Sequence, residues 1–208
     1  MRPYLTVAGA GEAEQTVERS RFIGYVRHAE TPEECEVFFD EVRRLHRTAT
    51  HNVPAYALGP AAALQWAGDD GEPRGTSGAP IVHMLVSEGI SDTAVIVTRY
   101  FGGIKLGTGG LMRAYTGTAK LAIAAAGLAE VAQRLVITVE LDYSAYNRVK
   151  GESGEFFTLG PATFADKVRT ELVTSAEKRT AALAALQAVA PGAVMISEET
   201  RVVRTLLE

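Results

Sequence analysis

The stretch TAVIVTRYFGGIKLGTGGLMRAY, Thr93–Tyr115, links two kinds of regular structure through a glycine-rich loop. Thr93–Tyr100 has the β-branched content of a buried strand, and Leu111–Gly127 has helical spacing with a glycine near its end. Five glycines lie within residues 102–110, where the chain leaves the strand and enters the helix. A buried strand followed closely by a helix predicts a domain of mixed α and β structure.

The residues before this stretch predict further strands and two helices. Proline directly after Thr31, with Glu33 and Glu34 in the first turn, predicts a helix from Pro32 to about His46. A Gly-Pro turn between two strand-like runs predicts a hairpin. The expected order is one or two strands within 14–29, the helix over 32–46, strands over 53–58 and 62–68, an irregular loop over 68–80 and a helix over 81–89.

The pattern restarts near Val131, which predicts a second domain. Residues 134–141, RLVITVEL, alternate apolar and polar side chains as a half-exposed strand does. A short helix over 143–152, two strands around Gly160 and Pro161, a periodic helix over 175–190 and a strand over 193–207 follow. This βαββαβ order is typical of a ferredoxin-like fold. We therefore predict an α+β protein of two domains, 1–131 and 132–208.

Composition limits the classes of function. The chain has 208 residues and a net charge of −4, so it is not a protein that coats nucleic acid through overall basicity. The charge is uneven, because residues 75–128 carry four Lys or Arg against two acids, whereas residues 30–41 carry six acids and no base. A nucleic-acid site would therefore be a local patch.

The cysteine count and the apolar runs indicate the compartment. Cys35 is the only cysteine, which rules out an intrachain disulfide and a multi-cysteine zinc cluster. The apolar runs are far shorter than the roughly 20 residues of a membrane helix, and the first residues lack the apolar core of a secretory signal. We expect a cytoplasmic protein without a membrane partner.

The loop between strand and helix is a candidate anion site, because backbone N–H groups at a helix start can hold a phosphate. It is not a P-loop, since the lysine that a P-loop has between its last glycine and the hydroxyl residue is missing between Gly107 and Thr108. It is not a dinucleotide fingerprint either, because Met112 occupies the position of the last glycine. The alternative is a tight packing corner whose bases pair with nearby acids. The candidate phosphate-binding residues are Arg99, Gly102, Gly103, Lys105, Gly107, Gly109, Gly110 and Arg113.

A second loop, GDDGEPRGTSGAP over residues 68–80, is rich in polar and small residues that would let a partner approach closely. Ser77 lacks the preceding strand of a nucleophile elbow, which favours a turn or capping role. The histidines do not form a zincin motif. The candidate partner or polar-site residues are His51, Asn52, Asp69, Asp70, Glu72, Arg74, Thr76 and Ser77.

Three segments resemble the IMPACT family, whose bacterial members are known as YigZ-type proteins. They are HRTATHNVPAYALG (46–59), DDGEPRGTSGAP (69–80) and VIVTRYFGGIKLGTGGLMRAY (95–115), and the resemblance covers essentially the whole chain. It implies a first domain similar to domain 2 of ribosomal protein S5 and a second, ferredoxin-like domain similar to domain V of elongation factor G. Arg74 departs from the family pattern, in which a small or polar residue is common at this position.

The resemblance also implies a role in translation. The same pair of folds resembles domains IV and V of elongation factor G, which implies contact with RNA or the ribosome by analogy of fold. Eukaryotic relatives regulate translation by binding the activator of an amino-acid-sensing kinase, a role that the resemblance does not carry over to this chain.

Three functions remain open. The first is a non-enzymatic factor that binds RNA or the ribosome through phosphate contacts, with Tyr100 or Phe101 stacking on a base. The second is a protein-interaction module in translation control or stress response that uses the loop over 68–80. The third is a hydrolase or metal-dependent enzyme centred on His51, Asp69, Asp70 and Ser77. We assign no catalytic residue and no metal ligand, and we expect no cofactor.

Overall fold

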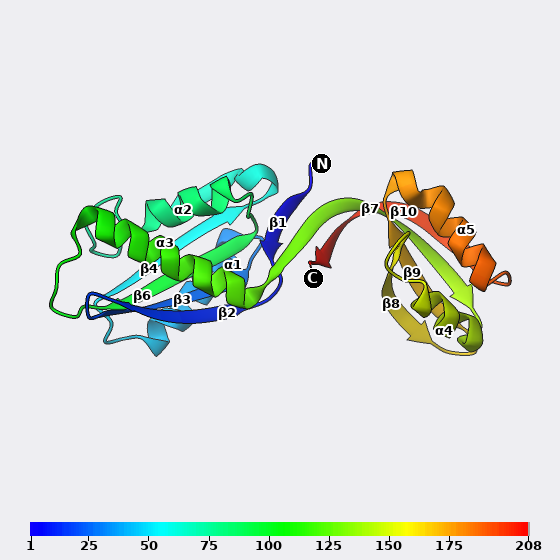
Figure 1. Ribbon diagram of the computed structural model, residues 1–208, viewed down its shortest axis with the longest axis horizontal. Coiled ribbons are helices and arrows are strands. Elements are labelled where there is room, and N and C mark those ends of the chain that lie inside the picture. The colour runs from blue at the N-terminus through cyan, green and yellow to red at the C-terminus, as the bar shows by residue number, and fades with distance from the viewer. Residues whose placement is uncertain (208) are drawn as a thin grey trace. The chain divides into compact units, whose positions relative to one another are not determined.

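The computed structural model describes residues 1–207 and shows the α+β class that the sequence predicts (Figure 1). Two compact units make up the chain. Unit 1 contains Met1–Val131 and the described residues from Arg204 onward, and unit 2 contains Ala132–Val203. Among the described residues, none of the helices is long and apolar enough to cross a membrane.

Unit 1 is built on an antiparallel sheet of five strands. Their order in the sheet is β2 (Gly11–Val17), β3 (Ser20–His28), β6 (Thr93–Tyr100), β4 (His51–Leu58) and β5 (Leu64–Ala67). A short 3-10 helix, η1 (Pro60–Ala62), joins β4 to β5. A further strand that the sequence did not predict, β1 (Tyr4–Val7), pairs with residues 128–131 at the start of the strand β7.

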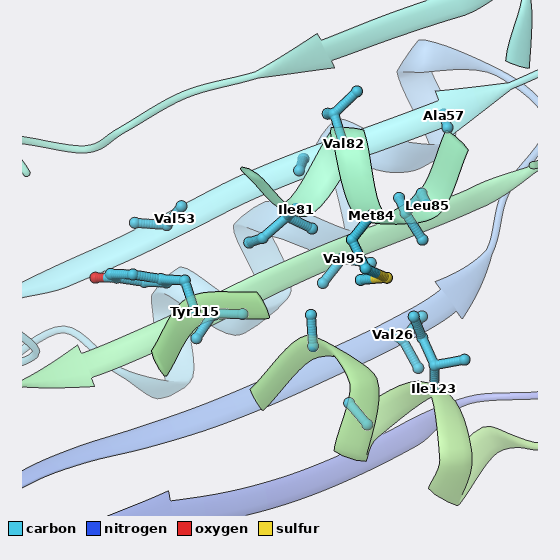
Figure 2. Packing of buried hydrophobic residues seen from close by; sticks show 14 of the residues in the cluster. Val26, Val53, Ala57, Ile81, Val82, Met84, Leu85, Val95, Tyr115 and Ile123 are labelled. Atoms are coloured by element: carbon cyan, nitrogen blue, oxygen red, sulfur yellow. The ribbon is translucent and has the colours of Figure 1, made fainter. Parts of the chain in front are cut away.

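Helices cover both faces of this sheet. The helices α2 (Gly78–Ser87) and α3 (Gly107–Ala126) pack on one face, where Ile81, Leu85 and Tyr115 meet strand residues such as Val95 (Figure 2). The helix α1 (Pro32–Leu45) packs on the other face, against a cluster that includes Ile96. Since both faces of β6 are buried, the strand needs apolar side chains at successive positions, as its sequence has.

The capping residues account for the bounds of α1. The Thr31 side chain accepts a hydrogen bond from the backbone N–H of Glu34 at 3.2 Å, and Pro32 occupies the first turn. The helix ends at Leu45, so the predicted helix of residues 32–46 is confirmed. Its end leads into the loop before β4.

Unit 2 has the βαββαβ order that the sequence predicts. The elements are β7 (Leu128–Leu141), α4 (Tyr143–Gly151), β8 (Thr158–Phe164), β9 (Val168–Thr174), the short 3-10 helix η2 (Ala176–Lys178), α5 (Arg179–Val189) and β10 (Val194–Leu206). The sheet order is β10–β7–β9–β8, the arrangement of a ferredoxin-like sheet. Ile137 and Leu172 on one face form a core with Val149 of α4 and Leu186 of α5.

Several predicted boundaries were wrong. Helix α2 begins at Gly78 instead of Ile81, and β7 begins at Leu128 instead of Arg134. Gly160 and Pro161 lie inside β8, at a register irregularity between Leu159 and Ala162, and the hairpin turn follows Phe164. Helix α3 begins at Gly107 instead of Leu111, because the glycines of the loop already adopt the first helical turn. A glycine-rich sequence leaves both alternatives open, and only packing decides between them.

Candidate functional site

Four connections meet at one end of the unit 1 sheet, where β2 and β6 end and β3 and β4 begin (Figure 1). They are residues 18–19, 46–50, 68–77 and 101–106, and we call this surface the loop end. Hydrogen bonds join the connection over 46–50 to the end of β6 and to the connection that follows it: the Thr50 N–H donates to Arg99 O at 2.9 Å, and the Phe101 N–H donates to the Thr50 hydroxyl at 3.0 Å. The loop end therefore unites both glycine-rich stretches that the sequence singled out.

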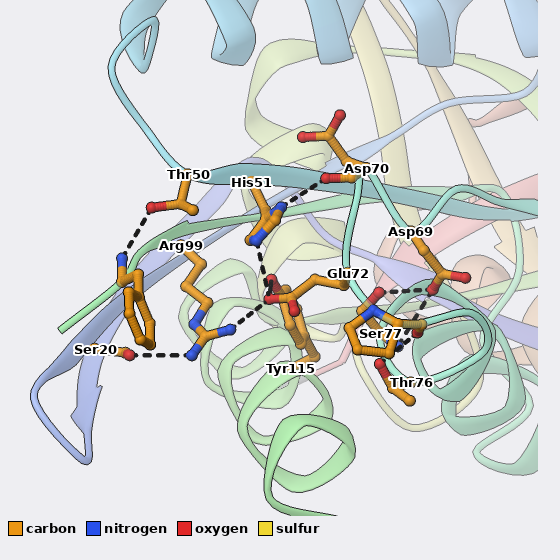
Figure 3. A network of polar contacts seen from close by, with 12 residues as sticks. Ser20, Thr50, His51, Asp69, Asp70, Glu72, Thr76, Ser77, Arg99 and Tyr115 are labelled. Carbon is orange, nitrogen blue, oxygen red and sulfur yellow. Dashed lines mark hydrogen bonds and ion pairs between the residues drawn. The ribbon is translucent and has the colours of Figure 1, made fainter. Parts of the chain in front are cut away.

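A buried ion pair lies beneath the loop end (Figure 3). The Arg99 guanidinium of β6 lies 2.6 Å from Glu72 Oε1, and only 5% and 4% of the two side chains are exposed. The Tyr115 hydroxyl of α3 donates to the same oxygen at 2.8 Å. Burial and then the bond to Glu72 raise the pKa of Tyr115 well above its usual value. Strand, loop and helix are thus joined at one carboxylate.

The contacts of Arg99 show that its side chain is part of the interior. It also donates to the Ser20 hydroxyl at 3.2 Å, and its Nε has no hydrogen-bond partner among the described residues. Ser20 in turn accepts from the Gly102 N–H at 3.2 Å. Arg99 was one of the candidate phosphate ligands, and the structure places it in an internal ion pair.

Asp69 organises the start of α2. Its carboxylate accepts the Ser77 hydroxyl at 2.6 Å and the backbone N–H groups of Gly75, Ser77 and Gly78 at 2.7, 3.3 and 3.0 Å. Burial alone would raise the pKa of Asp69, but these hydrogen bonds outweigh it and lower the pKa below the usual value. Asp69 therefore acts as the cap of α2, although it lies outside the helix.

The other polar candidates hold the loop over 68–77 against β4. Asp70 accepts from the Asn52 N–H at 2.5 Å, and His51 Nδ1 lies 2.6 Å from the Asp70 carbonyl oxygen, so this nitrogen carries the proton. His51 Nε2 faces Glu72 Oε1 at 3.7 Å. The Thr76 hydroxyl donates to the Pro73 carbonyl at 2.6 Å, which closes the turn.

These contacts do not assemble a hydrolytic centre. The Ser77 side chain is buried and its hydroxyl donates to Asp69, whereas His51 contacts Asp70 and Glu72. A serine nucleophile needs a base within hydrogen-bond reach and access to substrate. Within residues 1–207, no group of three or more His, Cys, Asp or Glu side chains is placed to hold a metal ion.

The glycines between β6 and the first turn of α3 allow close approach of the backbone and turning of the chain. A Cβ atom at Gly102 would lie 2.0 Å from the carbonyl oxygen of Arg19, so the loop packs directly on the β2–β3 turn. Gly103 and Gly107 have φ angles of 87° and 68°, which side chains other than glycine rarely adopt. Gly109 and Gly110 lie in the first turn of α3.

Replacing Gly102 with alanine is expected to lower the free energy of unfolding by ~2 kcal/mol, because the added methyl group overlaps the Arg19 backbone. Urea unfolding followed by Trp66 fluorescence measures this loss of free energy, since Trp66 of β5 is the only tryptophan in the sequence. Gly75→Ala is the control: its Cβ would meet no atom within 4 Å, although its φ of 75° adds strain of its own. A Gly102→Ala protein as stable as wild type would contradict the close approach.

Basic side chains point outward at the loop end. Arg19, Arg47, Arg74 and Lys105 belong to the loop end, and Arg113 of α3 lies beside it, where it lines a cavity with Glu18 and Leu106. All five are exposed, and none forms an ion pair with another described residue. The acids there are engaged internally, apart from Glu18: Asp69 caps α2, Asp70 holds Asn52 and Glu72 holds Arg99. The loop end thus presents positive charge although the whole chain is acidic.

Arg113 lies nearer the glycine-rich loop over 101–106 than its place in the sequence suggests. Because α3 starts at Gly107, Arg113 is in the second turn, and its Nη1 would be 3.4 Å from a Cβ at Gly109. The first turn has no acidic residue and no side-chain cap. Gly110, Arg113, Gln15 and Glu18 line a cavity of about 360 Å³ between α3 and the end of β2.

The two aromatic candidates differ in exposure. The Tyr100 hydroxyl bonds to His46 Nδ1 at 2.9 Å and the residue is half-buried, whereas Phe101 is 47% exposed. No sequence pattern indicated that Arg19 and Arg47 are neighbours of the glycine-rich loop. Tyr115 stood within the quoted stretch, but its helical position did not reveal that its hydroxyl reaches Glu72.

The fold and the site define a two-domain α+β protein whose two glycine-rich loops meet over a buried Glu–Arg pair. The model of the Impact N-terminal domain matches residues 18–123, which include the loop end. The chain belongs to the IMPACT family. It is 37% identical to IMPACT family member YvyE of Bacillus subtilis, over 82% of this chain and 79% of that protein.

Other relatives agree with this assignment. IMPACT family member YigZ of Escherichia coli is 38% identical over 56% of this chain and 58% of that protein. A solved crystal structure of a hypothetical protein has a TM-score of 0.61 at 26% identity, and the match covers 100% of this chain and 98% of that one. The two-domain fold is therefore shared over the full length.

Proposed function

We propose that this protein is a non-enzymatic factor in translation that binds RNA, including the RNA of the ribosome, through the loop end. The observation that carries the proposal is the separation of charge there: Asp69, Asp70 and Glu72 turn inward to hold the loops, whereas the five exposed basic side chains at or beside the loop end form no ion pair with another described residue. Phosphate groups are the ligands that such a surface attracts. The family resemblance to regulators of translation supports the same reading.

Each part of the loop end has a separate task in this proposal. Lys105 and Arg113 contact phosphates beside the glycine loop, with Arg19, Arg47 and Arg74 extending the basic surface. Arg99 holds the two loops together from below and does not contact RNA, since Glu72 neutralises it. Phe101 is the ring exposed enough to stack on a base. The protein acts in the cytoplasm, where RNA and ribosomes are available.

The test is a binding measurement with a labelled RNA hairpin and with purified ribosomes at low salt. Lys105→Glu with Arg113→Glu is expected to weaken binding at least ~10-fold and to reduce the slope of log K against log salt by about two. The control is Arg27→Glu with Lys120→Glu, which changes the net charge equally. These two bases already pair with Glu41 and Glu88, away from the loop end.

Three outcomes decide the proposal. Loss of binding in the loop-end variant alone supports it. Equal binding by both variants, or no binding by the wild type at low salt, contradicts it. Recovery from cell extract of one protein partner that resists nuclease and survives the loop-end substitutions would favour the protein-interaction module instead.

A further inference from the structure

The strand β10 is a long, unprotected edge of the unit 2 sheet. Its residues Val194–Leu206 pair with β7, the only neighbour assigned to it in the described structure, and every residue from 194 to 202 is exposed. The strand has no proline, and Val194, Met195, Ile196 and Val202 are each about half exposed. Edge strands of this length offer free N–H and C=O groups to another strand.

The opposite edge of the same sheet is protected. β8 carries Gly160 and Pro161 at a register irregularity, and a proline cannot donate to a neighbouring strand. The two edges therefore differ in one of the features that prevent strand addition: β8 contains a proline and β10 does not. This contrast indicates that β10 is the edge of this sheet at which a further strand can pair.

The contacts of β10 identify its two faces. Glu198 accepts from Arg179 Nε of α5 at 2.8 Å, so the even-numbered residues face the helices. Arg201 contacts Glu171, the neighbour of the core residue Leu172 on β9, so the odd-numbered residues face the open side.

These faces restrict how β10 could pair with a second copy. A two-fold axis between identical antiparallel strands is perpendicular to the sheet, so opposed residues come from the same face. The register that pairs the whole strand places Thr200 opposite Thr200 and Val194 opposite Leu206. It also places Glu199 opposite Arg201 twice. The adjacent allowed registers oppose Glu199 with Glu199, or Arg201 with Arg201.

We infer that β10 is a self-complementary edge through which two copies of this chain form an antiparallel dimer with one continuous sheet. The occupant is a second copy because maximal strand overlap and charge complementarity select the same register. Pairing covers the exposed apolar side chains near the ends of β10 and satisfies its free backbone groups. The inference does not depend on the proposed binding of RNA.

Two measurements on the full chain test the dimer. Sedimentation equilibrium is expected to give twice the 22.2 kDa mass of one chain, with dissociation on dilution. Glu199→Arg, which opposes two arginines, is expected to weaken the dimer at least tenfold. Adding Arg201→Glu to that variant restores the opposite charges and is expected to restore the dimer.

Cross-linking tests the register. Thr200→Cys places two thiols directly opposite, with Cβ atoms about 5 Å apart, so mild oxidation is expected to give a covalent dimer. Ser197→Cys is the control, because its two copies would be about 20 Å apart along the strands. The native Cys35 is buried and belongs to unit 1. A monomer at all concentrations, or cross-linking no faster at Thr200→Cys than at Ser197→Cys, overturns the inference.

Discussion

Replacing Glu72 with alanine is expected to lower the free energy of unfolding of unit 1 by about 3–5 kcal/mol. The substitution leaves the Arg99 guanidinium buried without its counter-charge and removes the acceptor of the Tyr115 hydroxyl. An unpaired buried charge costs far more than an exposed pair contributes. Urea unfolding followed by Trp66 fluorescence measures the loss, because this tryptophan lies in the sheet of unit 1.

Tyr115→Phe is the matched control for this prediction. It removes one hydrogen bond to the same carboxylate but leaves the ion pair, so the expected loss is about 1.5 kcal/mol. The phenylalanine ring keeps the edge-on packing of Tyr115 against Phe22, in which the ring centroids are 5.2 Å apart. If Glu72→Ala costs no more than Tyr115→Phe, the ion pair is not the contact that holds the loop end together.

Replacing Asp69 with alanine is expected to lower the free energy of unfolding by about 3 kcal/mol, the upper end of the range for hydrogen bonds to a charged group. Asp69 accepts from four donors, and the loss leaves the start of α2 and the Gly75 turn without their acceptor. The effect should extend to the RNA binding that we propose, because the same loop carries Arg74. Asp69→Asn keeps an acceptor oxygen, so its free energy of unfolding is expected to fall less than that of Asp69→Ala.

The pH dependence of this contribution follows from the lowered pKa of Asp69. A carboxyl group with a depressed pKa in the folded state binds its proton more readily when unfolded, so it stabilises the fold above the unfolded-state value of about 3.9. The contribution is lost as the pH falls through the folded-state pKa. The difference in unfolding free energy between wild type and Asp69→Asn should therefore shrink below about pH 4. A difference that stays constant would contradict the charged cap.

Local patterns predicted the elements of both units well. The helix of residues 32–46 had a proline, a capping threonine and first-turn acids, and each of these acts within one turn. The βαββαβ order of unit 2 followed from alternation and helical periodicity, which also depend only on neighbouring residues. The errors at Gly160, Pro161 and the starts of α2 and α3 arose where glycine and proline permit several local structures. The strand β1 and the first residues of β7, which pair with each other, were also missed, because this pairing joins residues far apart in the sequence.

The candidate site was predictable as a set of loops but not as a set of contacts. Gly102, Lys105 and Arg113 stood together in the sequence, and their loop does lie beside the start of α3. Arg99 stood beside them as well, yet its side chain is buried and held by Glu72. Arg99 is the only one of these three bases on a strand, and the side chain of a strand residue can face the interior while the loop that follows lies at the surface, so closeness in sequence does not place two charges on the same surface.

By itself, the sequence determined the α+β class, the order of the elements apart from β1, the position of the glycine-rich loops and the IMPACT family resemblance. These depend on periodicity, capping and turn chemistry, which operate over a few residues. The tertiary structure decided which charges are internal and which remain free for a ligand. Glu72 and Arg99 are 27 residues apart and meet only because the loop before α2 folds over the end of β6. Burial then makes that pair structural and leaves the exposed bases of the loop end for binding.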